Sequence, residues 1–166
     1  ELIRVLTPGG VLLEPTAEGW KKTVKPLPGE IDQWTHYLHG PDNNAVAQDR
    51  VVGPPQHFQW ISGPRFSRSH DHLASISAMV SAGGRLFSIV DEGSIAFAGA
   101  SPKWRLVARD AFNGLELWNR RITRWESVTM YIKCQPVQQQ RRMAVVGDRL
   151  YCTLQLEGPL SALDAA

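Results

Sequence analysis

The sequence predicts an all-β fold made of repeated units of short strands, with a short α/β segment at its N-terminus. Three observations predict this fold. From about residue 56 onward, short apolar runs alternate with glycine-centred turns. One strand–turn–strand pattern occurs twice along the chain. One of the turns is followed by a tryptophan that would supply a large flat surface for a neighbouring unit.

The composition excludes several classes of protein. The chain has 166 residues, the size of one ordinary domain. No apolar run approaches the ~18 residues of a membrane helix, so we expect no membrane span. With 18 basic and 16 acidic side chains, the net charge of +2 lacks the basic excess of a DNA-coating protein, and we expect no nucleic-acid partner. Two cysteines, Cys134 and Cys152, cannot build a disulfide scaffold or a four-cysteine zinc site. We expect free thiols, and a disulfide between the two is the alternative.

The first segment, residues 1–13, predicts a helical turn, a Pro-Gly-Gly turn and a short strand. Within it, RVLTPGGVL resembles the R-V-L-K-P-G-G-x-L segment of class I S-adenosylmethionine-dependent methyltransferases, with Thr7 in place of the usual Lys or Arg. The resemblance covers about a dozen residues and none of the family's glycine-rich cofactor loop. It therefore implies a methyltransferase-like remnant that cannot bind the cofactor.

Residues 14–55 predict a linker and an irregular lead-in to the strands. Residues 20–29 are rich in Lys and Pro and lack a sustained period, which is typical of an extended linker with a solvated basic face. Residues 40–44, Gly-Pro-Asp-Asn-Asn, have the composition of a turn.

Residues 56–166 predict strands joined by tight turns. We expect a short strand over 58–61 and antiparallel hairpins over 78–90 and 105–118. The segment 79–87, a strand, a glycine turn and Arg-Leu-aromatic, returns as 143–151.

The segment 106–110 likewise returns as 160–164, and the second copy then stops before its turn glycine and closing tryptophan. We therefore expect the chain to be a piece of a longer protein. Trp60, 58 residues before Trp118, is a candidate for the closing tryptophan of an earlier, incomplete unit.

Units of about four short strands, repeated every ~55 to 65 residues, are typical of β-propeller blades. A single blade cannot bury its apolar face and needs neighbours. The sequence therefore predicts a fragment of a β-propeller, about one full blade plus part of another, truncated at the C-terminus.

The closing motif has the pattern A-x-D-x-x-x-G-x-x-x-W. Ala108 would lie where sheets approach closely, and Asp110 would accept hydrogen bonds from the N–H groups of the turn. Gly114 would take a positive φ, and Trp118 would pack on the next blade, with an N–H that needs a partner. A second, cut copy of the motif begins at Ala162 and Asp164.

This pattern resembles the tryptophan-docking repeat of PQQ-like (quinoprotein-type) β-propellers, over roughly residues 56–166. The stretch from Trp34-Thr35-His36-Tyr37-Leu38-His39-Gly40-Pro41 through Phe112-Asn113-Gly114 is similar to large planctomycete-type members of that superfamily. Some of those carry a methyltransferase-like segment beside the propeller. The resemblance also implies an exported or periplasmic protein.

These features indicate a repeat module that serves as a binding or scaffold domain of a larger protein and is non-catalytic as it stands. Its partners would be the remaining blades and a protein or carbohydrate ligand. The alternatives are part of a quinoprotein dehydrogenase, which holds PQQ beside calcium, or of a methyltransferase fused to a propeller. A polysaccharide hydrolase or lyase has no specific support. Oxygen ligands for calcium could come from residues 42–44 and from Asp91 and Glu92, although turn chemistry explains each of them.

The sharpest polar cluster is His70-Asp71-His72. In an extended chain, His70 and His72 would lie on one face, as two metal ligands do, and His36 and His39 could add to them. Because serines and an arginine precede the cluster, we expect hydrogen-bonded loop histidines, and no metal or cofactor in this chain. The basic run at Arg120, Arg121 and Arg124 predicts a solvated strand edge.

Overall fold

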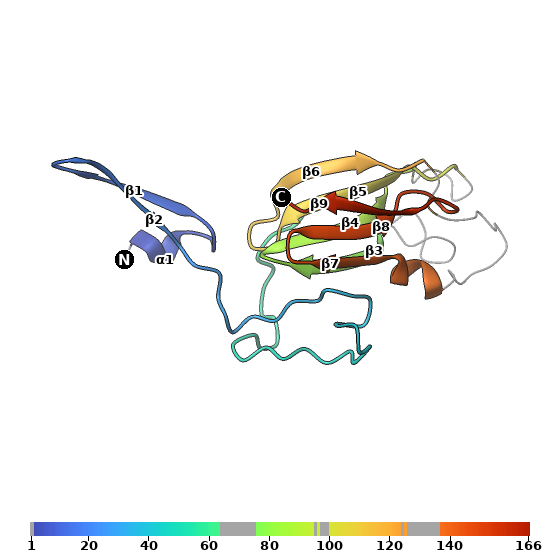
Figure 1. The fold of residues 1–166 in the computed structure, drawn as a ribbon, viewed down its shortest axis with the longest axis horizontal. Coiled ribbons are helices and arrows are strands. Elements are labelled where there is room, and N and C mark those ends of the chain that lie inside the picture. The colour runs from blue at the N-terminus through green and yellow to red at the C-terminus, as the bar shows by residue number, and fades with distance from the viewer. Residues whose placement is uncertain (1, 64–75, 95, 97–99, 124, 126–136) are drawn as a thin grey trace.

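The computed structural model describes residues 2–63, 76–94, 96, 100–123, 125 and 137–166, and the described chain is mostly antiparallel β-sheet (Figure 1). It contains a two-stranded, a four-stranded and a three-stranded sheet. The all-β class expected from the sequence is therefore confirmed. Among the described residues, no helix is long and apolar enough to cross a bilayer.

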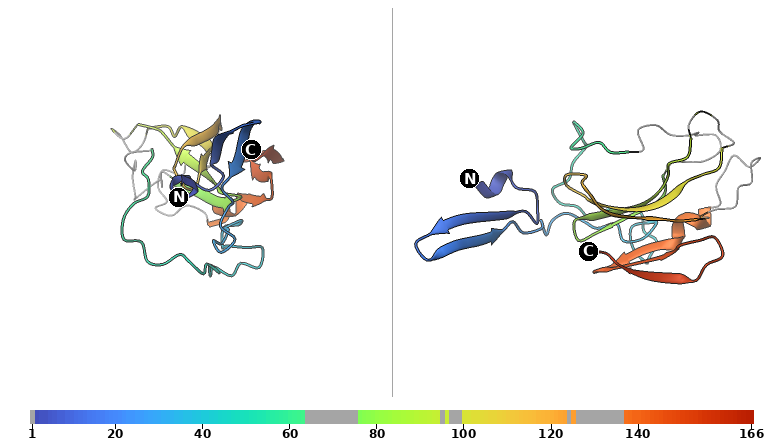
Figure 2. Two further views of the ribbon diagram at one scale, coloured as in Figure 1. Left: turned by 90° about the vertical axis from the view of Figure 1, so that its left-hand side faces the viewer. Right: turned by 90° about the horizontal axis from the view of Figure 1, so that it is seen from above.

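The N-terminal unit consists of α1 (Leu2–Val5), β1 (Val11–Thr16) and β2 (Gly19–Val24), and lies apart from the larger sheets (Figures 1 and 2). The expected order of helix, turn and strand is present. The ammonium group of Lys25 donates hydrogen bonds to the carbonyls of Leu6, at 2.6 Å, and Arg4, at 3.0 Å. These carbonyls belong to the end of the helix, where lysine is favourable.

One expectation for this region is corrected. Residues 14–24, which the sequence assigns to a linker, complete β1 and form β2, and the two strands pair antiparallel with Val11 opposite Val24 and Thr16 opposite Gly19. The boundary between 13 and 14 therefore falls inside a strand. The residues of β1, VLLEPT, and of β2, GWKKTV, do not alternate between apolar and polar, so the hairpin lacks the period of two from which a strand is predicted.

The four-stranded sheet contains β3 (Ile76–Ala82), β4 (Arg85–Asp91), β5 (Trp104–Asp110) and β6 (Glu116–Arg121), in that order. All neighbours are antiparallel. Both predicted hairpins are confirmed. The β3–β4 turn is formed by Gly83 and Gly84, whose φ values of 58° and 74° suit the two-residue hairpin turns that match strand twist.

The three-stranded sheet contains β7 (Met143–Val146), β8 (Arg149–Thr153) and β9 (Leu160–Asp164), preceded by the 3₁₀ helix η1 (Val137–Arg142). It lies face to face with the four-stranded sheet, and β7 lies near β3 (Figure 2). A single hydrophobic core joins the two sheets. Its largest fully buried side chains include Trp104, Trp125, Phe87, Leu106, Met143 and Leu150.

The strand expected over 58–61 is absent. The side chains of this segment bond instead to the turn after β5. The Trp60 indole N–H donates to the carbonyl of Ala111 at 2.9 Å, and the Gln59 amide donates to the carbonyl of Phe112 at 2.6 Å. The segment is held by side chains rather than by a backbone ladder, so its apolar residues do not indicate a strand.

Candidate functional site

The hairpin of β5 and β6 contains the four predicted motif residues: Ala108 and Asp110 lie in β5, Gly114 in the turn and Trp118 in β6. The Asp110 carboxylate accepts hydrogen bonds from the N–H of Phe112 at 2.8 Å and of Asn113 at 3.0 Å. Gly114 has φ 75°, and a Cβ at that position would lie 2.5 Å from the Trp60 ring. Ala108 lies opposite Trp118 in the ladder. Asp110 and Gly114 thus have the interactions that the sequence predicted for them.

The second copy of the motif begins with the same geometry. The Asp164 carboxylate accepts a hydrogen bond from the N–H of Ala166 at 3.0 Å, two residues on, as Asp110 does. The N–H of Ala165 donates to the carbonyl of Asp148 at 3.0 Å. Its counterpart in the first copy, the N–H of Ala111, donates to the carbonyl of Gly84 at 2.9 Å. The two segments therefore share these hydrogen bonds at equivalent positions.

The two candidate closing tryptophans differ in their surroundings. Trp60 has its indole bonded to Ala111 and its ring against Gly114, in the turn of the following unit. Trp118 packs against the core, with its ring centroid 6.0 Å from that of Phe87, but its indole N–H has no hydrogen-bond partner among the described residues. A cavity of about 370 Å³ separates this part of β6 from β9, lined by Trp118, Asn119, Arg120, Leu163, Asp164 and Ala166.

The two sheets bury opposite faces of the repeated unit. Leu106 is fully buried between the sheets, whereas its counterpart Leu160 is 68% exposed. Ala82 is 4% exposed and its counterpart Val146 is 59% exposed. Conversely, Met143 is buried in the second sheet, and its counterpart Met79 is half exposed in the first. One face of the first unit therefore packs on the other face of the second, which is a head-to-tail contact rather than a back-to-back one.

The lead-in segment joins the two sheets at β3 and β7. The carbonyl of Trp34 accepts a hydrogen bond from the N–H of Ser81 at 2.7 Å, and the carbonyl of Thr35 accepts one from the N–H of Val145 at 3.0 Å. Ser81 and Val145 are counterparts in the repeat. The N–H of Trp34 also donates to the Ser81 hydroxyl at 3.1 Å. Consecutive carbonyls of one segment therefore bond to equivalent positions of both units.

A tight turn follows, in which His39 adopts φ 70°. The His39 ring bonds to the Asp32 carboxylate at 2.7 Å and lies edge-on to the Trp34 ring, with centroids 5.3 Å apart. The backbone N–H of Gln48 also donates to Asp32. That hydrogen bond, with others from Gln33 and His39, lowers the pKa of the Asp32 carboxyl below its ordinary value, against the opposing effect of burial.

A pocket of about 490 Å³ lies between this turn and the edge of the four-stranded sheet. It is lined by Trp34, Tyr37, residues 76–81, Leu86 and Gln140. Ser77 is 1% exposed, and within the described part of the chain its hydroxyl has no hydrogen-bond partner. Sequence reasoning did not find this pocket, because Trp34 and Ser81 lie 47 residues apart and no motif connects them.

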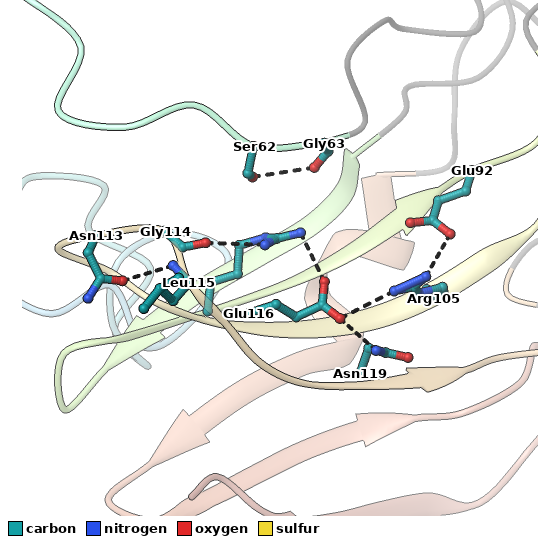
Figure 3. Close-up of polar contacts among 10 residues, drawn as sticks. Ser62, Gly63, Glu92, Arg105, Asn113, Gly114, Leu115, Glu116 and Asn119 are labelled. Atoms are coloured by element: carbon teal, nitrogen blue, oxygen red, sulfur yellow. Dashed lines mark hydrogen bonds and ion pairs between the residues drawn. The ribbon is translucent and has the colours of Figure 1, made fainter.

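A network of charged and polar side chains lies along β5 and β6 (Figure 3). Glu116 binds Asn119 at 2.6 Å, Arg109 at 3.2 Å and Arg105 at 3.4 Å, and Arg105 also binds Glu92 at 3.0 Å. Burial alone would raise the pKa of Glu116, but the hydrogen bonds from Asn119 and Arg105 and the charges of both arginines lower it. Both carboxylates of this network, Glu92 and Glu116, are paired with arginine side chains, so neither offers an unpaired negative charge to a cation.

The residues considered for a metal or for calcium are engaged in local structure where they are described. Besides His39, His36 bonds through Nδ1 to the Thr35 hydroxyl at 2.8 Å. Asp42 accepts the N–H of Asn44. Asp91 is 1% exposed and accepts the N–H groups of Gly93 and Lys103.

His70, His72, Arg124 and Cys134 lie outside the described residues. Cys152 is a buried free thiol, as expected. Within the described ranges, no group of three or more His, Cys, Asp or Glu side chains could hold a metal ion.

Comparison of the chain with protein-family models, with curated proteins and with solved structures finds no match.

Proposed function

We propose that this chain is part of a PQQ-like β-propeller and serves as a binding or scaffold module of a larger protein. The observation that carries the proposal is the head-to-tail packing of the two sheets. Counterparts such as Leu106 and Leu160 are buried in one unit and exposed in the other, because each unit offers one face forward and the other backward. Repeats that stack in this way can each be covered only by a neighbour of the same kind.

The two tryptophans support the same proposal. Trp60 reaches from before the first unit to bond with Ala111 in that unit's turn. Trp118 occupies the next such position and lines a cavity beside Asp164 and Ala166, which flank the counterpart of Ala111. A strand that completed the second unit beside β9 would close this cavity. On this proposal, Trp118 would then donate to Ala165 as Trp60 donates to Ala111.

Completing the second unit tests the proposal. The residues 113–121, which form the turn and β6 of the first unit, are appended after Ala166, where the repeat places their counterparts. We expect a higher urea midpoint and slower exchange of the Trp118 indole proton, because the added strand would cover β9 and the cavity. The control carries the same residues in reverse order. An equal midpoint for the two extended chains would contradict the proposal.

The dehydrogenase alternative makes a separate prediction. A cofactor held at the centre of a propeller needs surrounding blades to enclose it, and among the described residues only the four-stranded and three-stranded sheets pack on each other. Titration with PQQ and CaCl₂, followed by tryptophan fluorescence, is expected to show no saturable change at micromolar concentrations. A saturable change would favour the quinoprotein alternative over a non-catalytic module.

A further inference from the structure

The pocket beside β3 has walls that are already fixed in place. The Trp34 indole donates to the carbonyl of Tyr37 at 3.2 Å, and the Trp34 backbone bonds to Ser81 through both its N–H and its carbonyl. The guanidinium of Arg141 lies over the Tyr37 ring, 5.9 Å from its centroid, which favours one orientation of that ring. Two aromatic side chains are therefore held at the pocket before any ligand binds.

The chemistry of the lining is neutral. Among the described residues, no charged side chain lines the pocket. The polar side-chain groups of the described lining include the hydroxyls of Tyr37, Ser77 and Ser81 and the amide of Gln140. Ser77 is the informative one, because a buried hydroxyl without a partner carries a desolvation cost that a bound donor or acceptor would remove. The remaining walls are apolar, with Ile76 and Met79 about half exposed.

We propose that this pocket binds a neutral sugar ring. Such a ligand has an apolar face that packs on aromatic side chains and hydroxyl groups that bond to Ser77 and Gln140. The pocket volume of about 490 Å³ lies within the usual range of small-ligand sites, ~300 to 1,000 Å³. This proposal names a class of ligand for the binding module proposed above, and it therefore rests on that proposed function.

Two other ligand classes fit the pocket less well. An anion or cation would find no opposite charge among the described lining residues, since the nearby Arg141 guanidinium lies over Tyr37. An extended peptide would need the open backbone edge of β3. The N–H of Ser81 already donates to the carbonyl of Trp34, and η1 and β7 contact that strand, so part of its edge is occupied.

Saturation-transfer NMR on the whole chain tests the proposal, with D-glucose and N-acetyl-D-glucosamine as neutral probes. We expect saturable binding with a dissociation constant on the order of millimolar. Ser77→Ala should weaken binding by about fivefold, the usual effect of one hydrogen bond. It should leave the urea midpoint unchanged or higher, because the hydroxyl has no partner to lose. Tyr37→Phe, which keeps the ring, separates the contribution of the phenol hydroxyl.

Ser101→Ala is the matched control, since Ser101 is exposed and does not line the pocket. Three results would overturn the proposal: no saturable signal from either sugar at tens of millimolar, equal binding by the Ser77 and Ser101 variants, or tighter binding of glucuronate or of an uncharged acetyl-(Val-Thr)₂-amide peptide. Such a failure is distinguishable from failure of the stacking proposal, because the strand-extension experiment measures stability and indole exchange without any ligand.

Discussion

The four-stranded and three-stranded sheets share a short pattern of residues, yet they bury opposite faces. In the first sheet, Phe87 and Leu106 are fully buried against the second sheet. In the second sheet, their counterparts Tyr151 and Leu160 face outward. The pattern of apolar residues marks both faces of the unit as suitable for contact. Which face is buried therefore depends on the sheet that packs on it, and not on the local sequence alone.

The largest expected difference between the two sheets concerns the repeated leucine. Leu106→Ala should destabilise the protein by about 2 to 5 kcal/mol, through lost burial and the cavity left behind. Leu160→Ala should change stability by no more than about 0.5 kcal/mol, because Leu160 is 68% exposed. Urea denaturation of both variants measures the difference. Similar losses would mean that the outer face of the second sheet is covered in solution, and the comparison between the sheets would fail.

A second, smaller difference should separate the tryptophans of the sheets from that of the N-terminal hairpin. Trp118 packs against the core beside Phe87, whereas Trp20 in β2 is 70% exposed. Truncating a fully buried Trp costs ~3 to 5 kcal/mol. Because Trp118 is only partly buried and borders a cavity, Trp118→Ala should fall near the lower end of that range. Trp20→Ala should cost about 0.5 kcal/mol or less.

The urea midpoints and slopes of these two variants provide the check. Equal midpoints with equal slopes would show that Trp118 does not stabilise the contact between the sheets. The propeller proposal would then lose the contribution of its closing tryptophan, although the head-to-tail burial of the leucines would stand.

The sequence predicted the parts of the fold whose signal is local. The hairpins at Gly83-Gly84 and around Gly114 combine apolar runs with turn residues, and the bonds of Asp110 follow from turn chemistry. The β1–β2 hairpin was missed because neither of its strands alternates between apolar and polar residues. Spacing along the chain marks Trp60 as a candidate closing tryptophan, but no local signal identifies Ala111, 51 residues away, as the partner of its indole.

The candidate pocket shows the same limit. Each of its components is ordinary along the chain: an aromatic pair near residue 35, a serine early in β3 and a glutamine in η1. Their meeting depends on the hydrogen bonds from Trp34 and Thr35 to the two sheets. Contacts of this kind, between a lead-in segment and strands far along the chain, leave no periodic signal in the sequence.

A third prediction uses the buried thiol of the second sheet. Burial raises the pKa of Cys152 from 9.0 to about 11, partly offset by the charge of Arg120. The unfolded chain therefore releases this proton at lower pH than the folded chain. The corresponding stability is fully present below pH 9.0 and is lost as the pH rises toward about 11. The expected loss is on the order of 2 kcal/mol.

Urea denaturation between neutral and alkaline pH measures this loss, and Cys152→Ala is the control, because it removes the titrating group and keeps a small apolar side chain. Above pH 9.0, the free energy of unfolding should fall less steeply with pH in the variant than in the original chain. An identical dependence of the unfolding free energy on pH would mean that the first sheet does not keep water from Cys152, contrary to the burial of that residue.

The smallest expected effect compares the two motif turns. Asp110 accepts two backbone N–H groups in a turn that also supports Trp60, whereas Asp164 accepts one, from Ala166. Hydrogen bonds to a charged acceptor contribute more than neutral ones, so Asp110→Ala should destabilise the protein by roughly 1 to 2 kcal/mol. Asp164→Ala should cost about 0.5 kcal/mol, because it removes a single exposed bond. Urea midpoints of the two variants give the comparison, and Asp110→Asn, which keeps an acceptor oxygen, should recover much of the loss. Equal destabilisation of the two alanine variants would mean that the complete turn after Asp110 contributes no more stability than the incomplete one after Asp164. Gly114 and Trp118 would then not account for a difference in stability between the two turns.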